Sequence, residues 1–161
     1  MNIFLLADNP ADCARMHCDK HCIKMIVEYC QILSTTCHIF NLYATGLYKK
    51  THANHPSTIW ARQSKQNYDY LLELTMELME EYTYRYGKVH ASTKVIPKLI
   101  DNAELIPLGE NKLTPFVAVL PGKIEYCKSH YEAIKVYRKL YMNERRSMCT
   151  WKNRNIRTWF K

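Results

Sequence analysis

The sequence contains few glycines: four among its 161 residues, at positions 46, 87, 109 and 122. An all-β protein with many tight turns would need more of them. Neither a phosphate-binding loop nor a dinucleotide-binding glycine fingerprint is present. No run of 18 apolar residues without a charge occurs, so we expect no membrane-spanning helix. No basic region precedes the apolar N-terminus, which therefore does not resemble a secretion signal, and we expect an intracellular protein without membrane association.

The seven cysteines lack the Cys-x-x-Cys spacing of structural zinc sites, and five of them lie within residues 13–37. We interpret them as reduced thiols that serve as small core residues. His17 and His21, with cysteines nearby, form the one arrangement that could bind zinc. On a helix, however, Cys18 and Cys22 would point away from His21, so we expect no metal and no cofactor.

The net charge of +8 is concentrated at one end of the chain. Residues 130–161 contain nine Lys or Arg and two Glu, whereas the other 129 residues contain 14 basic and 13 acidic side chains. The tail 151–161 also interleaves three aromatic side chains with four cations, a pattern typical of contacts to phosphates and unpaired bases. We therefore expect a polyanionic partner, nucleic acid above all. A solvated basic surface, or a tail that docks on the core, remains the alternative.

Hydrophobic periodicity predicts two long helical segments, over about residues 10–43 and 56–86. Asn9 followed by proline is typical of a helix start. We expect a break near Cys18-Asp19 in the first segment and a left-handed stop at Gly87 after the second.

A third helix is predicted from Ser129, where a capping box begins, to about Arg146. Residues 91–128 contain four prolines and predict an irregular excursion with a short helix at about 94–101. The sequence therefore predicts an all-α fold. We expect a compact single domain over 1–161, with three main helices, the long proline-containing excursion and the basic aromatic tail.

The first helical segment is apolar on most sides, and its polar residues form one narrow strip: His21, Lys24, Glu28 and Gln31, with Lys20 at the margin. A buried helix carries such a row when the row lines a cleft or finds partners. A strip that simply faces solvent is the alternative. Acid–base and amine chemistry around Glu28 is the catalytic arrangement that the sequence favours.

The second helical segment places Asn67 and Arg85 within its core-facing stripe. An arginine in such a stripe needs a carboxylate, an aromatic ring or a phosphate opposite its guanidinium group. A structural ion pair and a contact to a nucleic-acid phosphate are equally compatible with this position.

Three blocks of the sequence resemble a known family: Asp19-Lys20-His21 followed by Glu28, the helix start His55-Pro56, and the terminal residues 158–161. They are similar to the phage and algal-virus pyrimidine-dimer DNA glycosylase/AP-lyase family of the endonuclease V type. The chain also resembles uncharacterised small proteins of phages and large DNA viruses. The family resemblance implies a small, basic, all-α, metal-free enzyme that acts on double-stranded DNA with a lesion or modified base. It implies no obligate protein partner.

The resemblance also implies catalytic roles. An α-amine would attack the sugar carbon C1′ and form a Schiff base, Glu28 would assist β-elimination, and His21 would lie at the lesion. The target nucleotide or its partner would have to leave the base stack. Because Asn2 is not small, we expect Met1 to remain and to supply the amine; Asn2 would supply it if Met1 were removed. Lys24, or Lys20, is the fallback amine.

The residues expected to contact DNA are Lys20, Gln31, His52, His55, Asn67, Arg85, Lys88, Arg138, Trp151, Lys152, Arg154, Arg157, Trp159 and Lys161. Two other functions remain open. One is a different enzyme for nucleotides or modified bases that uses the cleft of His21, Lys24 and Glu28. The other is a non-catalytic DNA-binding protein, in which the basic tail drives salt-dependent binding and Glu28 has no role.

Overall fold

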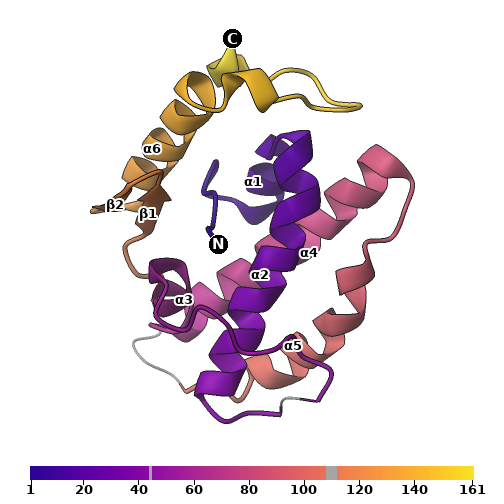
Figure 1. Ribbon diagram of the computed structural model, residues 1–161, viewed down its shortest axis with the longest axis vertical. Coiled ribbons are helices and arrows are strands. Elements are labelled where there is room, and N and C mark those ends of the chain that lie inside the picture. The colour runs from indigo at the N-terminus through magenta and orange to yellow at the C-terminus, as the bar shows by residue number, and fades with distance from the viewer. Residues whose placement is uncertain (44, 108–111) are drawn as a thin grey trace.

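The computed structural model describes residues 1–43, 45–107 and 112–161, and most of these residues are helical (Figure 1). Residues 108–111, which belong to the expected excursion, lie outside the described residues. The α-helices and β-strands are α1 (Pro10–Met16), α2 (Asp19–Ile39), α3 (Pro56–Ala61), α4 (Lys65–Tyr86), α5 (Ile96–Ala103), β1 (Val117–Leu120), β2 (Lys123–Tyr126) and α6 (His130–Asn143). The short 3₁₀ helices are η1 (Ala91–Val95), η2 (Arg146–Met148) and η3 (Thr158–Phe160).

The first helical segment is divided as the sequence predicts. The side chain of Asn9 accepts a hydrogen bond from the backbone N–H of Asp12, which satisfies a free donor at the start of α1. The chain leaves helical geometry at His17, where ψ is 130°, and α2 begins two residues later. Helix α2 ends at Ile39, so the expected end near residue 43 is wrong by about one turn.

The second helical segment is two helices, and the expectation of one continuous helix is wrong. Ser64 adopts an extended conformation, and its side chain accepts a hydrogen bond from the N–H of Asn67. Helix α3 ends at Ala61, and the cap at Ser64 begins a separate helix, α4. Gly87 ends α4 in the left-handed region, with φ of +64°, as predicted.

The fold is mostly helical but not all-α, because residues 117–126 form a β-hairpin. Strands β1 and β2 pair antiparallel, with Val117 opposite Tyr126 and Leu120 opposite Lys123. Gly122 allows the tight turn between them, with φ of +68°. The expected short helix in the excursion is present as α5. The hairpin lies within the segment that we expected to be irregular.

Helix α6 starts at the predicted cap, where the side chain of Ser129 accepts a hydrogen bond from the N–H of Glu132. It ends at Asn143, about one turn before the predicted end near Arg146, and the short 3₁₀ helix η2 follows. One face of α6 is buried in the core and consists of Ile134, Tyr137, Leu140 and Tyr141.

Helices α1 and α2 both pack against α4, and the hairpin packs against α3 and α6. The N-terminal segment 2–7 has no regular structure and runs between α2 and the hairpin with α6 (Figure 1). Its residues 3–6 are almost entirely buried, so the start of the chain passes through the protein interior. Within the described residues, no helix is both long and apolar enough to cross a bilayer.

Candidate active site

The buried N-terminal segment is held in place by its backbone hydrogen bonds. A buried backbone N–H or C=O needs a partner, and this segment finds its partners on side chains. Tyr29 Oη accepts from the N–H of Phe4 at 3.1 Å, and Arg138 Nε donates to the carbonyl of Leu6 at 2.9 Å. Cys13 Sγ accepts from the N–H of Leu6 and donates to the carbonyl of Phe4. The position of the chain's first residues is therefore fixed by α1, α2 and α6.

His17 supports this arrangement as a neutral side chain. Burial lowers its pKa to about 3. Its Nδ1 lies 2.8 Å from the carbonyl of Cys13, which can only accept, so Nδ1 carries the proton. Nε2 then accepts from the hydroxyl of Tyr29 at 2.7 Å. Both ring nitrogens are engaged, so His17 has no nitrogen left for the zinc arrangement considered above. In the described ranges, no group of three His, Cys, Asp or Glu side chains could hold a metal ion.

Three nitrogen atoms surround the carboxylate of Glu28 on α2. The α-amine of Met1 lies 3.6 Å from Oε2, and the backbone N–H of Asn2 donates to the same oxygen at 3.0 Å. Nζ of Lys24, one turn earlier on the helix, lies 3.2 Å from Oε1. The side chain of Glu28 is 13% exposed and that of Lys24 is 71% exposed. An amine and a carboxylate thus meet where one side of the site remains open to solvent.

His21 lies on the same face of α2, two turns before Glu28. Its ring stacks on Phe4, with ring centroids 4.1 Å apart and 18° between the planes. Its Nδ1 lies 2.6 Å from the hydroxyl of Tyr141 on α6. The ring is therefore held from both sides and is 5% exposed.

These residues line a pocket of about 300 Å³, which is large enough for a small ligand or a single base. Its wall residues are Met1, Asn2, Phe4, His21, Lys24, Met25, Glu28, Val119, Leu120, Pro121, Leu140 and Arg145. They come from the N-terminal segment, α2, the hairpin, α6 and the residue that precedes η2. All five residues predicted for catalysis are among them. Three residues of the polar strip on α2, His21, Lys24 and Glu28, therefore line the pocket, whereas Gln31 and Lys20 do not.

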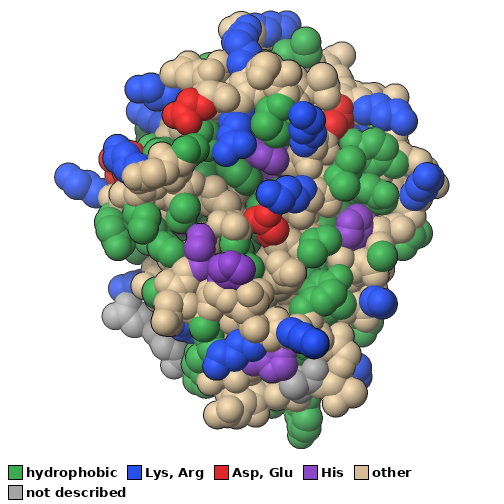
Figure 2. Space-filling model, in the orientation of Figure 1, with side chains coloured by type: hydrophobic (Ala, Val, Ile, Leu, Met, Phe, Trp, Pro, Cys, Tyr) green, Lys and Arg blue, Asp and Glu red, His purple; other side chains and the backbone are tan. Residues whose placement is uncertain are grey.

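The face shown in Figure 2 carries many Lys and Arg side chains and few Asp or Glu. One acidic side chain near its centre is bordered by basic and histidine side chains. Such a surface attracts a polyanion.

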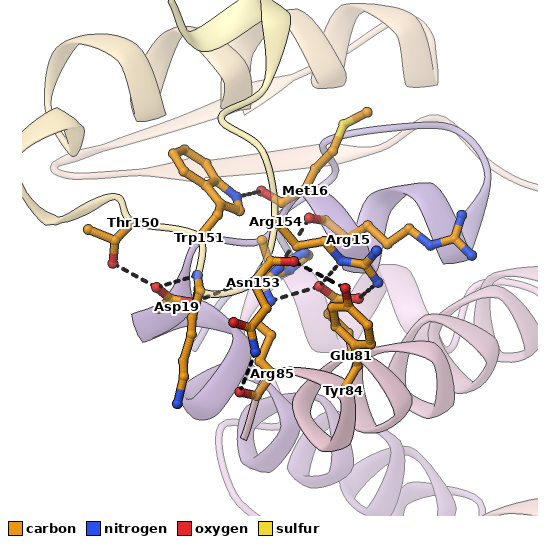
Figure 3. Close-up of polar contacts among 12 residues, drawn as sticks. Arg15, Met16, Asp19, Glu81, Tyr84, Arg85, Thr150, Trp151, Asn153 and Arg154 are labelled. Carbon is orange, nitrogen blue, oxygen red and sulfur yellow. Dashed lines mark hydrogen bonds and ion pairs between the residues drawn. The ribbon is translucent and has the colours of Figure 1, made fainter. Parts of the chain in front are cut away.

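Arg85 is not available to DNA, because it is buried in an ion-pair network (Figure 3). Its Nε donates to Glu81 at 2.7 Å and its Nη1 to Asp19 at 3.0 Å, and Nη2 donates to the carbonyl of Arg15. Arg154 from the tail donates twice to the same Glu81, at 3.0 and 2.7 Å. Burial alone would raise the pKa of the Glu81 carboxyl, but the hydrogen bonds from Arg154 and Arg85 outweigh it, and the pKa is lowered. The structural alternative for Arg85 is therefore the correct one.

Asn67 is also a structural residue, and its expected contact with DNA is wrong. It is fully buried, and its Nδ2 donates to the carbonyl of Trp60 at 2.7 Å and to Oγ1 of Thr114 at 2.6 Å. Its Oδ1 accepts from the N–H of Thr114 at 2.9 Å. The side chain ties α4 to the segment that leads into the hairpin.

The aromatic tail docks on the core, which is the alternative that the sequence left open. Trp151 is 6% exposed, and its indole N–H donates to the carbonyl of Met16 at 3.0 Å. Arg157 donates to the carbonyl of Arg15, and Trp159 lies half-buried beneath the guanidinium group of Arg138. Interleaved cations and rings therefore fix the tail to the protein.

The remaining predicted DNA contacts lie outside the pocket wall. Gln31 is half-buried on α2, and His55 caps α3 by accepting from the N–H of Ser57. The exposed ones are Lys20, His52, Lys88, Lys152 and Lys161.

Sequence reasoning missed part of the pocket. Val119, Leu120 and Pro121 belong to the hairpin, which the sequence did not predict. Arg145 was not among the residues predicted for the site, but it lines the pocket. Its place within the basic C-terminal stretch was the one available signal.

The site combines a basic face with an amine beside a carboxylate in a pocket. The family model described as pyrimidine dimer DNA glycosylase matches residues 1–95, and the chain belongs to this family. Membership places it among the DNA repair glycosylases, with DNA as substrate. The match includes Asn2, His21 and Glu28 but not the hairpin or α6. No curated protein and no solved structure matches the chain.

Proposed function

We propose that the protein removes a damaged or modified base from duplex DNA and then cleaves the strand as an AP lyase. The α-amine of Met1 is the nucleophile, and Glu28 is the catalytic carboxylate. The observation that carries this proposal is the 3.6 Å separation between that amine and Glu28 Oε2 at a pocket the size of a base.

The chemistry follows from this pair of groups. The amine nitrogen bonds to C1′, and the bond between C1′ and the base breaks; the base leaves with the electron pair and takes up a proton. The amine then gives one proton to Glu28, the C1′–O4′ bond breaks and O4′ takes up a proton as the sugar ring opens, which leaves a Schiff base between the nitrogen and C1′. A base then removes a proton from C2′, the C3′–O bond breaks, and the 3′ phosphate leaves. Glu28 is placed to accept the proton from the amine and later that from C2′.

The other pocket residues suit this reaction. The base or its partner nucleotide must leave the stack to enter the pocket, which costs least at a damaged step. His21 and Phe4 present ring surfaces at the wall, while Arg145 and Lys24 supply positive charge for the flanking phosphates. If Met1 is removed, the amine of Asn2 takes its place, since that nitrogen is already 3.0 Å from Glu28 Oε2.

Borohydride trapping tests the proposal, because it reduces a Schiff base to a stable link between protein and DNA. Incubation with an abasic duplex and borohydride should give a covalent complex, and an irradiated duplex should give one more slowly. Glu28→Gln keeps the acceptor for the Asn2 N–H but cannot take up a proton, so strand cleavage should fall by about a hundredfold or more. Glu73→Gln, an exposed change on α4, should cleave at the unchanged rate.

Two results would contradict the proposal. The first is the absence of any trapped complex with abasic DNA. The second is normal cleavage by Glu28→Gln. Activity on free nucleotides but not on DNA would favour a nucleotide enzyme, and salt-dependent DNA binding without cleavage would favour a binding protein.

A further inference from the structure

The side chain of Asn2 is locked by hydrogen bonds to the hairpin and α6. Its Nδ2 donates to the carbonyl of Val119 at 2.7 Å. Its Oδ1 accepts from the hydroxyl of Tyr137 at 2.7 Å and from the N–H of Ile3 at 2.8 Å. The Tyr137 oxygen in turn accepts from the N–H of Val119 at 3.0 Å. The backbone N–H and the carbonyl of Val119 therefore both have hydrogen-bond partners, and so do Nδ2 and Oδ1 of Asn2.

Tyr137 can act in this contact only as a neutral hydroxyl. It is fully buried, and burial raises the pKa of its phenol well above the usual range. The proton therefore stays on Tyr137 and is donated to Asn2. The chain Asn2–Tyr137–Val119 is a closed set of donors and acceptors, and any one member that is lost leaves the others unpaired.

This contact lies one residue from the reacting amine. The first residues of a chain are usually mobile unless they are tied down. Here the side chain of Asn2 is fixed on one side by the hairpin, and its backbone N–H is fixed on the other by Glu28. The side chain of Met1 is 3% exposed, and its Sδ accepts from the hydroxyl of Thr58. The amine of Met1 is thereby confined to the edge of the pocket.

We propose that Asn2 and Tyr137 are positioning residues, which tie the start of the chain to the hairpin and hold the α-amine at Glu28. The hairpin, although it lies beyond the segment that the family model matches, is then part of the catalytic centre. This inference rests on the proposed function, because the group that is positioned is its nucleophile.

Tyr137→Phe tests the inference, since it keeps the ring and removes the hydroxyl. Under single-turnover conditions with abasic DNA, borohydride trapping should slow by about tenfold or more, because a small displacement of the nucleophile is costly. The dissociation constant for DNA should not change. Tyr131→Phe, an exposed tyrosine on the same helix, is the matched control and should trap at the wild-type rate.

Asn2→Leu removes the other half of the contact at a partly exposed site and, because leucine is not small, leaves Met1 in place, so it serves if Tyr137→Phe does not fold. Both variants remove the same hydrogen bond between Asn2 and Tyr137. The double variant should therefore trap DNA no more slowly than the slower single variant. Rates that multiply in the double variant would overturn the inference, and so would wild-type trapping by either single variant.

A second measurement does not depend on catalysis. Reductive methylation with ¹³C-formaldehyde labels the α-amine, and the NMR line width of the added methyl groups reports its mobility. The line should be broad in the wild type and in Tyr131→Phe, and narrow in Tyr137→Phe and Asn2→Leu. Unchanged broad lines in both would overturn the positioning role. If the wild type forms no trapped complex, the proposed function fails, while the line widths still decide whether Asn2 and Tyr137 fix the amine.

Discussion

The α-amine of Met1 lies 3.6 Å from Oε2 of Glu28, so the start of the chain meets the middle of helix α2. The contact depends on an N-terminal segment that is buried rather than free. It places an amine and a carboxylate together at a pocket that His21, Lys24 and Glu28 of α2 line.

Replacing Arg145 should weaken DNA binding through charge. Arg145 lines the pocket, where a phosphate beside the target nucleotide would approach. Loss of one phosphate contact reduces the slope of log K against log salt concentration by about 0.9. Arg145→Gln should therefore show a smaller slope in a fluorescence anisotropy titration, and Lys94→Gln, an exposed change on η1, should not. Equal slopes for Arg145→Gln and the wild type would exclude this contact.

Replacing Arg85 should destabilise the protein without a direct effect on DNA contacts. Arg85→Met leaves the buried Glu81 and the nearby Asp19 without a shared cation, and breaking a buried pair costs about 3–5 kcal/mol. Arg15→Met breaks an exposed pair with Asp12, which contributes about 0–1 kcal/mol. Urea unfolding at pH 7 measures both free energies. A loss for Arg85→Met no larger than that for Arg15→Met would contradict the network's role.

The buried histidine predicts a loss of stability in mild acid. The pKa of His17 is about 3 in the folded protein and about 6.5 when unfolded, so only the unfolded chain takes up this proton between those values. Stability is complete above about pH 6.5 and falls as pH drops toward 3. Burial also lowers the pKa of His55 and His90, which adds to the fall.

Unfolding at pH 6.5 and pH 5 isolates these histidines from Asp19 and Glu81, whose stabilising effect is lost only at lower pH. His17→Gln should be less stable than the wild type at pH 7.5, because it loses the Tyr29 contact, but it should lose less stability between the two pH values. An identical pH slope in the variant would contradict the lowered pKa of His17 in the folded protein.

Three core cysteines should resist alkylation until the protein unfolds. Burial raises the pKa of Cys13 to about 11 and those of Cys22 and Cys30 to about 12, so at pH 8 they carry no reactive thiolate. Iodoacetamide followed by peptide mass spectrometry should find all three unmodified in the native protein and modified in urea. Rapid labelling of Cys30 in the native protein would contradict its burial.

Features set by neighbouring residues were predictable from the sequence. The caps at Asn9 and Ser129 and the stop at Gly87 depend on local side chains and backbone preferences, and each lies where expected. The polar strip was predictable because helical periodicity places His21 and Glu28 on one face. Periodicity does not show what covers a face, so the hairpin wall of the pocket could not be anticipated.

Features decided by distant partners were not predictable. The strands of the hairpin have four residues each, too short for a clear alternation, and they depend on packing against α3 and α6. Arg85 and Arg154 meet the same carboxylate of Glu81 from different parts of the chain. A cation that binds a buried carboxylate and a cation that binds a phosphate look alike in sequence. The break before Ser64 falls inside a continuous periodic pattern, so tertiary packing determined it.

Mass spectrometry of the trapped complex tests the central claim most directly. After reduction with borohydride and digestion of protein and DNA, the sugar remnant should be found on the α-amine of the first residue, in the peptide that contains Asn2. The same spectrum shows whether Met1 is present. A remnant on Lys24 or Lys20, with the N-terminal peptide unmodified, would contradict the claim that the amine at Glu28 is the nucleophile.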